Sequence, residues 1–212
     1  MDFGVSEGHG HDEIRTSVLR LCERFDDAYW LDHDRDGGFP HEFHAAMAEG
    51  GWLGLAMPEA YGGAGLGIAE AAVMMLAVAE SGAAMSGASA IHVNIFGLNP
   101  VVVFGTEEQK RRMLPPLIAG RDKACFAVTE PDAGLNTVEL KTRAVRDGDD
   151  YVVHGTKIWI STAQVASKIL LLARTTPLEQ VTRRTGGLRA HPKITASTGG
   201  AFVAAGCAGW IV

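Results

Sequence analysis

The stretch CFAVTEPDAG occupies residues 125–134, and the pattern of the chain changes there. Its first half is a short β-type run, and the Glu-Pro-Asp-Ala-Gly that follows is typical of a turn. The residues before it show the spacing of helices, and the residues after it show the patterns of strands. Helices that precede strands, instead of alternating with them, predict an α+β protein and argue against an alternating α/β sheet.

The part of the chain before this stretch is expected to be helical. Helical spacing is expected over residues 11–30, 40–50, 68–81 and 91–104. The last of these is apolar nearly all round, which predicts a buried helix. Thr106 followed three residues later by Gln109 is typical of a capped helix start, and that helix should run towards Ala119. We therefore predict an N-terminal all-α domain over residues 1–121.

The part of the chain after this stretch is expected to form strands. Residues 142–146 and 151–154 flank an Asp-Gly pair, which predicts a β-hairpin. Residues 157–161 alternate as a strand should, and residues 169–173 form a short apolar run that suits a buried strand. We therefore predict a small, mainly antiparallel β-domain over residues 122–179.

The last part of the chain differs in composition from the rest. Residues 180–212 contain four basic residues and no acidic ones, since the last acidic residue is Glu179. They show no clear periodicity after about Arg184. We predict an irregular C-terminal tail over residues 180–212, either disordered or produced by a shifted reading frame.

The overall composition excludes several classes of protein. The 212 residues are 47% hydrophobic and 21% charged, which is ordinary for a globular protein. A net charge of -6 gives no support for a nucleic-acid or membrane-surface role. Three dispersed cysteines give no zinc motif and no disulfide framework. No secretory signal is visible and no apolar stretch reaches about 20 residues, so a cytoplasmic protein is expected.

One local motif suggests calcium as a minor alternative. Asp32, Asp34 and Asp36, followed by Gly37, match the first positions of an EF-hand loop. The last position of such a loop needs a bidentate Glu, and this sequence has Phe43 there. The pattern therefore favours a solvated connector between helices over a calcium site, and no other metal site is predicted.

Six segments, taken in order, resemble the acyl-CoA dehydrogenase family. They are GWLGL (51–55), PEAYGG (58–63), FGTEEQK (104–110), LPPLIAG (114–120), VTEP (128–131) and GTKIWIS (155–161). Matches in the same order over most of the chain are far more specific than any single motif.

The resemblance implies an FAD-dependent oxidoreductase of fatty acid metabolism. It implies an N-terminal helical domain, a middle β-domain and a C-terminal four-helix domain, with FAD between the last two. A carboxylate base would remove a proton from Cα of an acyl-CoA thioester while a hydride passes from Cβ to flavin N5. Electrons would then pass to an electron-transfer flavoprotein, and members of the family form homo-oligomers.

The resemblance also implies which residues contact the flavin. Phe126, Val128 and Thr129 should line the flavin ring through backbone and hydroxyl contacts. Trp159 and Ser161 should flank the ring from the second motif.

The turn between the two motifs departs from the family. Gly134 and Leu135 should lie where FAD and the thioester approach the turn. The family usually reads Gly-Ser-Asp there, whereas this chain reads Gly134-Leu135-Asn136, so a hydroxyl and a charge are lost. Ser161 replaces a common Thr and keeps the hydroxyl.

The family's C-terminal domain has no counterpart in this sequence, although it usually carries the catalytic Glu. No catalytic residue is therefore assigned, and Glu130 belongs to the flavin-side turn. We expect a truncated chain with little or no turnover by itself. The alternative is a non-catalytic remnant that binds flavin or other subunits.

Overall fold

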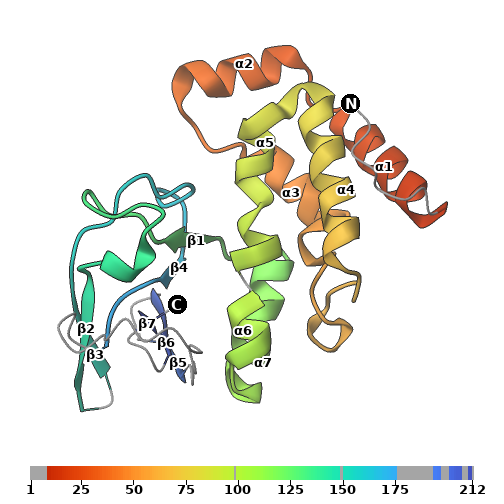
Figure 1. The fold of residues 1–212 in the computed structure, drawn as a ribbon. Coiled ribbons are helices and arrows are strands. Elements are labelled where there is room, and N and C mark those ends of the chain that lie inside the picture. Colours follow the sequence, from red (N-terminus) through yellow and green to blue (C-terminus); the bar gives the residue numbers. More distant parts are fainter. Residues whose placement is uncertain are drawn as a thin grey trace. The chain divides into compact units, whose positions relative to one another are not determined.

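The computed structural model describes residues 9–97, 99–148, 150–175, 193–196, 201–206 and 210–211. A mostly helical N-terminal part is followed by a small β region, which confirms the predicted fold class (Figure 1). The chain divides into two compact units. The first comprises Met1–Asn99 and Arg111–Arg121, and the second comprises Pro100–Lys110 and Asp122–Val212.

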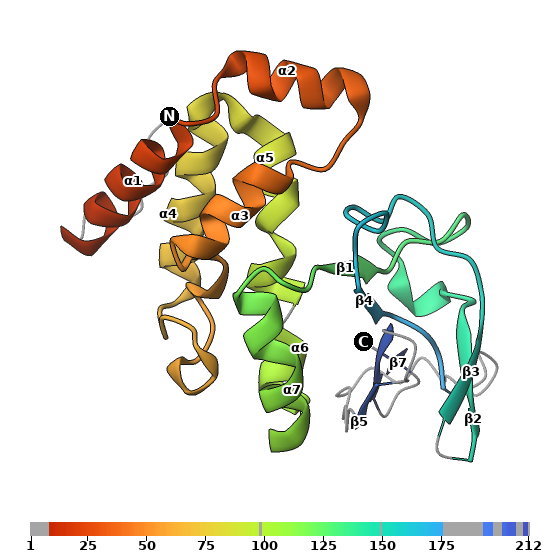
Figure 2. The same cartoon turned by 180° about the vertical axis from the view of Figure 1, so that it is seen from behind.

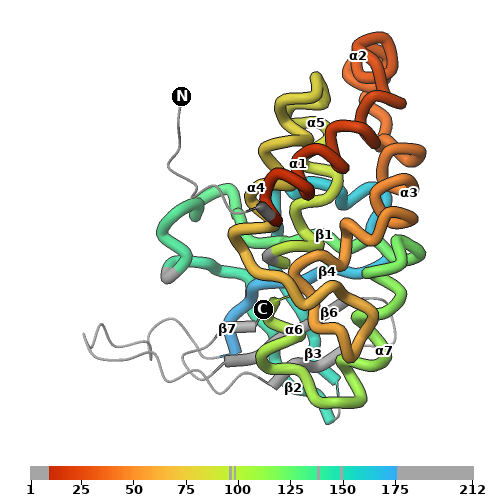
Figure 3. Tube along the Cα trace, turned by 90° about the vertical axis from the view of Figure 1, so that its right-hand side faces the viewer, coloured from red at the N-terminus to blue at the C-terminus, as the bar shows by residue number. Residues whose placement is uncertain are grey.

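Helices build the first unit. They are α1 (His9–Cys22), α2 (Asp27–Asp36), α3 (His41–Glu49), α4 (Ile68–Val78) and α5 (Ala84–Ile91), with 3-10 turns η1 (Trp52–Gly54) and η2 (Glu59–Tyr61). Helix α1 lies beside α4, as Figures 1 and 3 show. Val18, Phe43, Met47 and Met74 are at most 1% exposed. Their burial on one side of each helix is the reason that apolar spacing locates these helices.

The predicted helix over residues 11–30 is wrong in one respect, because the chain breaks between α1 and α2. Asp26 caps α2, since its carboxylate accepts a hydrogen bond of 2.9 Å from the backbone N–H of Tyr29. The indole of Trp30 donates to the carbonyl of Phe25 at 3.2 Å. A capping aspartate therefore starts a second helix where apolar spacing alone predicts a continuous one.

The structure contradicts both predictions for residues 32–38, the solvated connector and the calcium loop. Asp32, Asp34 and Asp36 lie on α2, which ends at Gly37 with a φ of 68°. Arg35 donates to the carboxylate of Asp32 at 2.6 Å. Alternate residues of a helix point to different sides, so the three carboxylates do not converge as a Ca²⁺ loop requires. Among all the described residues, no three His, Cys, Asp or Glu side chains could hold a metal ion.

Residues 68–91 form a longer helical run than the predicted helix over 68–81. Helix α4 continues through the π-helical turn η3 (Ala79–Ala83) into α5, with non-helical backbone at Gly82 (φ 94°) and Ala84 (φ 45°). By length and composition this run could cross a membrane, but a core helix of a soluble protein passes the same test. The sequence predicts no apolar stretch of about 20 residues, because Glu70 and Glu80 interrupt the apolar residues of this region, and both lie within the helical run.

The predicted buried helix over residues 91–104 is wrong. The structure has a π-helical turn, η4 (Val93–Gly97), and a separate short helix, α6 (Asn99–Phe104). Val103 and Phe104 are 56% and 45% exposed. Pro100 lies at the start of α6, where a missing N–H is tolerated, and a proline cannot continue a preceding helix.

The capped start of the next helix is confirmed. The backbone N–H of Gln109 donates to the hydroxyl of Thr106 at 3.2 Å, and the side-chain oxygen of Gln109 accepts from the N–H of Thr106 at 2.9 Å. Helix α7 (Glu107–Ile118) follows, and the chain leaves it through Gly120 with a φ of 69°. A local sequence pattern suffices here because both partners lie within one helical turn.

Short strands build the second unit (Figure 2). They are β1 (Ala124–Ala127), β2 (Arg143–Asp147), β3 (Asp150–His154), β4 (Lys168–Leu171), β5 (Lys193–Ala196), β6 (Ala201–Gly206) and β7 (Trp210–Ile211). One sheet has the order β1-β4-β6-β5, with β7 paired to β6. The β1–β4 and β4–β6 pairs are parallel, and the β5–β6 and β6–β7 pairs are antiparallel.

The predicted β-hairpin is confirmed and forms a sheet of its own. Strands β2 and β3 pair antiparallel, with Arg143 opposite His154 and Asp147 opposite Asp150. Gly148 adopts a φ of 60° in the turn, as an Asp-Gly hairpin requires. The predicted strand over residues 169–173 is also present, as β4.

The predicted strand over residues 157–161 is wrong, because this segment is irregular. Trp159 has a φ of 55°, which is incompatible with an extended strand. After Thr175, in the stretch predicted as an irregular tail, the described residues form β5, β6 and β7. Apolar and β-branched residues in 193–196 and 201–206 account for these strands. The remaining residues of the predicted tail lie outside the described part of the chain.

Candidate functional site

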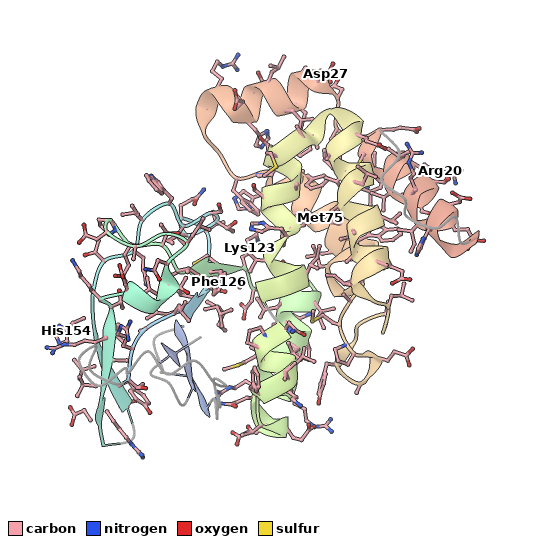
Figure 4. All side chains as sticks on the ribbon, in the orientation of Figure 1. Arg20, Asp27, Met75, Lys123, Phe126 and His154 are labelled. Atoms are coloured by element: carbon pink, nitrogen blue, oxygen red, sulfur yellow. The ribbon has the colours of Figure 1, made fainter. Side chains whose placement is uncertain are left out.

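The first predicted motif follows the end of β1. Phe126 is half-buried on this strand, where Figure 4 labels it together with Lys123. Glu130 and Ala133 close the turn after the strand, since each donates its N–H to the carbonyl of the other, at 2.9 and 3.2 Å. Pro131 and Asp132 form the exposed tip of this turn. The predicted strand end and proline turn are therefore both present.

The carboxylate of Glu130 is the centre of a buried hydrogen-bond network. It is 4% exposed and accepts hydrogen bonds from the backbone N–H groups of Lys141, at 2.6 Å, and Thr142, at 2.9 Å. The ammonium of Lys157 donates to it at 2.9 Å. Burial by itself would raise the pKa of Glu130, but hydrogen bonds from Thr142, Lys141 and Lys157 lower it to about 2. The group is therefore ionised and held in place at neutral pH.

Lys157 connects the two predicted motifs. Its ammonium donates to the carbonyl of Val128 at 2.7 Å as well as to Glu130. The backbone N–H of Ile158 donates to the carbonyl of Thr129 at 3.0 Å. Burial lowers the pKa of Lys157, and the carboxylate of Glu130 opposes that effect. The structure therefore brings Val128 and Thr129 next to the segment that carries Trp159.

Trp159 presents an apolar ring to solvent. Its side chain is 87% exposed, and its φ of 55° lies in the left-handed region that residues other than glycine rarely adopt. Ser161, two residues later, is also exposed, and Thr162 again has a positive φ of 70°. Strained backbone that carries an exposed aromatic ring is common at binding sites.

Gly134 and Leu135 lie directly after the turn. Both are exposed, and Leu135 is exposed completely. A Cβ atom added to Gly134 would meet nothing within 4 Å, so no described neighbour crowds the backbone there. These two residues lie on the loop that leads to the 3-10 turn η5 (Thr137–Glu139). Their predicted contact with FAD and thioester remains a prediction.

Sequence reasoning missed the Glu130–Lys157 ion pair. The motif that contains Lys157 is predicted as a strand, and that prediction gives its lysine no partner. A lysine that opens an otherwise apolar segment, Lys157 to Ile160, was the available signal, because such a charge needs a partner when the segment is half-buried. The partner is 27 residues away, so spacing gives no indication of it.

The chain matches two domain models of one family. The model described as "Acyl-CoA dehydrogenase, N-terminal domain" matches residues 9–121, which is more than half of the chain. The chain belongs to the acyl-CoA dehydrogenase family. The model described as "Acyl-CoA dehydrogenase, middle domain" matches residues 125–199. The second match extends beyond Glu179, where the sequence predicts the β-domain to end.

Curated acyl-CoA dehydrogenases resemble this chain over most of its length. Acyl-CoA dehydrogenase FadE12 of Mycobacterium tuberculosis is 34% identical over 175 residues, which is 82% of this chain and 44% of that protein. Probable acyl-CoA dehydrogenase YngJ of Bacillus subtilis is 38% identical over 144 residues, 67% of this chain and 37% of that protein. This member of the family thus spans less than half the length of these relatives.

Solved structures have a fold similar to that of this chain. An acyl-CoA dehydrogenase from Geobacillus kaustophilus has a TM-score of 0.74 at 30% identity, covering 81% of this chain and 45% of that one. The FAD complex of PigA has a TM-score of 0.74 at 25% identity, covering 84% of this chain and 46% of that one. The ChsE4–ChsE5 complex from Mycobacterium tuberculosis has a TM-score of 0.72 at 26% identity, covering 100% of this chain and 58% of that one.

Proposed function

We propose that this chain supplies the flavin-side surface of an FAD-dependent acyl-CoA dehydrogenase. The observation that carries the proposal is the connection between the two motifs, because the segment that bears the exposed ring of Trp159 is hydrogen-bonded to the residues that follow β1. The family match and the FAD complex of a structural relative support the same cofactor. The activity proposed for the whole protein is α,β-dehydrogenation of an acyl-CoA thioester.

The residues present fit a flavin ring on this surface. Trp159 offers a flat apolar face, and the hydroxyls of Thr129 and Ser161 can act as donors to ring oxygens and nitrogens. When bound, FAD would accept the hydride that leaves the substrate. The contribution of these side chains is to bind and orient the ring and to exclude water from one face of it.

Glu130 does not fit the role of the catalytic base. Its oxygens accept three hydrogen bonds, from Lys141, Thr142 and Lys157, and its pKa of about 2 makes it a very weak proton acceptor at neutral pH. We therefore assign Glu130 to the support of the flavin side and give it no role in proton transfer.

The family also suggests partners. We propose an acyl-CoA thioester as substrate, an electron-transfer flavoprotein as electron acceptor, and assembly with further chains. The last point is supported by the multi-chain ChsE4–ChsE5 complex, which aligns with all of this chain. Flavin binding without turnover is the alternative outcome, and the experiment below distinguishes the two.

The proposal predicts that FAD binds through Trp159. The full chain is titrated with FAD, and binding is followed by the quenching of flavin fluorescence. Trp159→Ala should weaken binding about tenfold, because stacking on an aromatic ring contributes about 1.4 kcal/mol. Trp52→Phe, in the helical unit, is the matched control and should leave the dissociation constant unchanged.

Two results separate the outcomes of this experiment. No binding by the unaltered chain at micromolar concentration would contradict the flavin-side function. Binding that is followed by no reduction of the flavin on addition of an acyl-CoA would indicate the non-catalytic alternative.

A further inference from the structure

The two flavin-side motifs are joined by one buried ammonium group. Lys157 is 9% exposed in its side chain and donates to the carbonyl of Val128 at 2.7 Å and to the carboxylate of Glu130 at 2.9 Å. The next residue, Ile158, donates its N–H to the carbonyl of Thr129 at 3.0 Å. Residues 157–158 are therefore fixed to residues 128–130 by three hydrogen bonds immediately before Trp159.

Packing cannot fix the position of the Trp159 ring, because the side chain is 87% exposed. The orientation of the ring must therefore come from the backbone that carries it. That backbone is strained, since a φ of 55° is unfavourable for a residue other than glycine and persists only where the surroundings impose it. The surroundings on its N-terminal side are the bonds of Lys157 and Ile158.

Glu130 is suited to hold Lys157 in one geometry. Its carboxylate is fixed by the N–H groups of Lys141 and Thr142, so it cannot rotate to follow a mobile ammonium. A buried ion pair contributes little net stability compared with apolar residues of the same size, but it restricts geometry because both charges must remain paired. This makes a role in positioning a better account of the pair than a role in stability.

We propose that the Glu130–Lys157 ion pair is a positioning pair that holds the strained backbone of Trp159 and so orients its indole towards a bound flavin ring. The proposal rests on the flavin-side function proposed above. It assigns neither residue a contact with the reacting atoms. Its consequence is that loss of the pair frees the ring while the rest of the β unit keeps its fold.

The test uses a neutral replacement of the pair in the full chain. Glu130→Gln/Lys157→Met removes both charges together, so that no unpaired charge stays buried. The matched control is Asp122→Asn/Lys168→Met, because Lys168 and Asp122 also form an ion pair in the same unit, at 3.0 Å. Glu130→Gln by itself is the single-residue variant, whose amide oxygen keeps an acceptor for one of the two backbone N–H groups and which leaves the ammonium of Lys157 without its counter-charge.

Two readouts are measured on each protein. Fluorine NMR of fluorotryptophan-labelled chain reports the mobility of the ring without any flavin, and Trp159→Phe assigns its resonance among the four tryptophans. The dissociation constant for FAD reports the consequence for binding. We expect the Trp159 resonance to narrow and shift in the double variant and FAD affinity to fall about tenfold. The control should show neither change.

Each result decides the proposal. A folded double variant with an unchanged Trp159 resonance and unchanged FAD affinity would overturn it and leave the pair a structural one. If the double variant does not fold, Glu130→Gln decides in the same way, and an unchanged resonance again overturns the proposal. If the unaltered chain binds no FAD, the flavin-side function fails, while the resonance still shows whether the pair orients the ring.

Discussion

Glu130 shows the limit of sequence reasoning at the scale of single residues. Its place in a turn could be predicted, because proline and glycine mark the turn locally. Its burial and its charge partners could not, because the contributing groups come from Thr142 and Lys157, 12 and 27 residues along the chain. The positive φ of Trp159 was equally invisible, since tertiary hydrogen bonds impose it on a segment with strand-like alternation.

The low pKa of Glu130 predicts acid sensitivity. Its usual pKa is 4.5 and its folded value is about 2, so the unfolded chain takes up this proton first as pH falls. The stabilisation is complete above about pH 4.5 and is lost as pH falls towards about 2, by about 3 kcal/mol. Urea unfolding of the β unit between these pH values should therefore show a smaller decrease in stability for Glu130→Gln than for the unaltered chain. Equal decreases in the free energy of unfolding of the two proteins would contradict the prediction.

At the scale of elements, structures that depend on neighbouring residues could be predicted, and structures that depend on distant contacts could not. The capping box of Thr106 and Gln109 and the β2–β3 hairpin were predicted because each depends on neighbours within a few residues. The prediction of a strand over residues 157–161 is wrong because the carbonyls of Val128 and Thr129, which are distant in sequence, hold that segment. The prediction of one helix over residues 91–104 is wrong because it rests on apolar composition alone, whereas Pro100 separates α6 from the preceding turn.

The break between α1 and α2 gives a prediction at this scale. Asp26→Ala removes the acceptor for the N–H of Tyr29 and should lower the free energy of unfolding by about 1 kcal/mol. Asp34→Ala is the matched control, because it removes the same charge from an exposed position on α2 itself. Thermal unfolding followed by circular dichroism measures both. An equal loss of unfolding free energy in the two variants would mean that the negative charge of Asp26, and not its capping hydrogen bond, stabilises the helix.

At the scale of the whole molecule, the order of motifs was the strongest signal. Six segments in sequence predicted the family, and the two domain matches confirm it. The parallel pairing of β1 with β4 could not be predicted, because an apolar run such as residues 169–173 indicates neither which strand it pairs with nor whether the pairing is parallel or antiparallel. The strands after Thr175 were missed because a change in charge composition carries no information on strand pairing.

The division into two units, each with buried side chains of its own, predicts that their stabilities can be changed separately. Asp26→Ala lies in the helical unit, and Glu130→Gln/Lys157→Met lies in the β unit. Hydrogen exchange followed by mass spectrometry should therefore show faster exchange in α2 and α3 for the first variant, and in β1 and β4 for the second. The reciprocal peptides should keep their rates, because mutations in separate units that share no partners act independently. Faster exchange throughout the chain in either variant would show that the two units unfold as one.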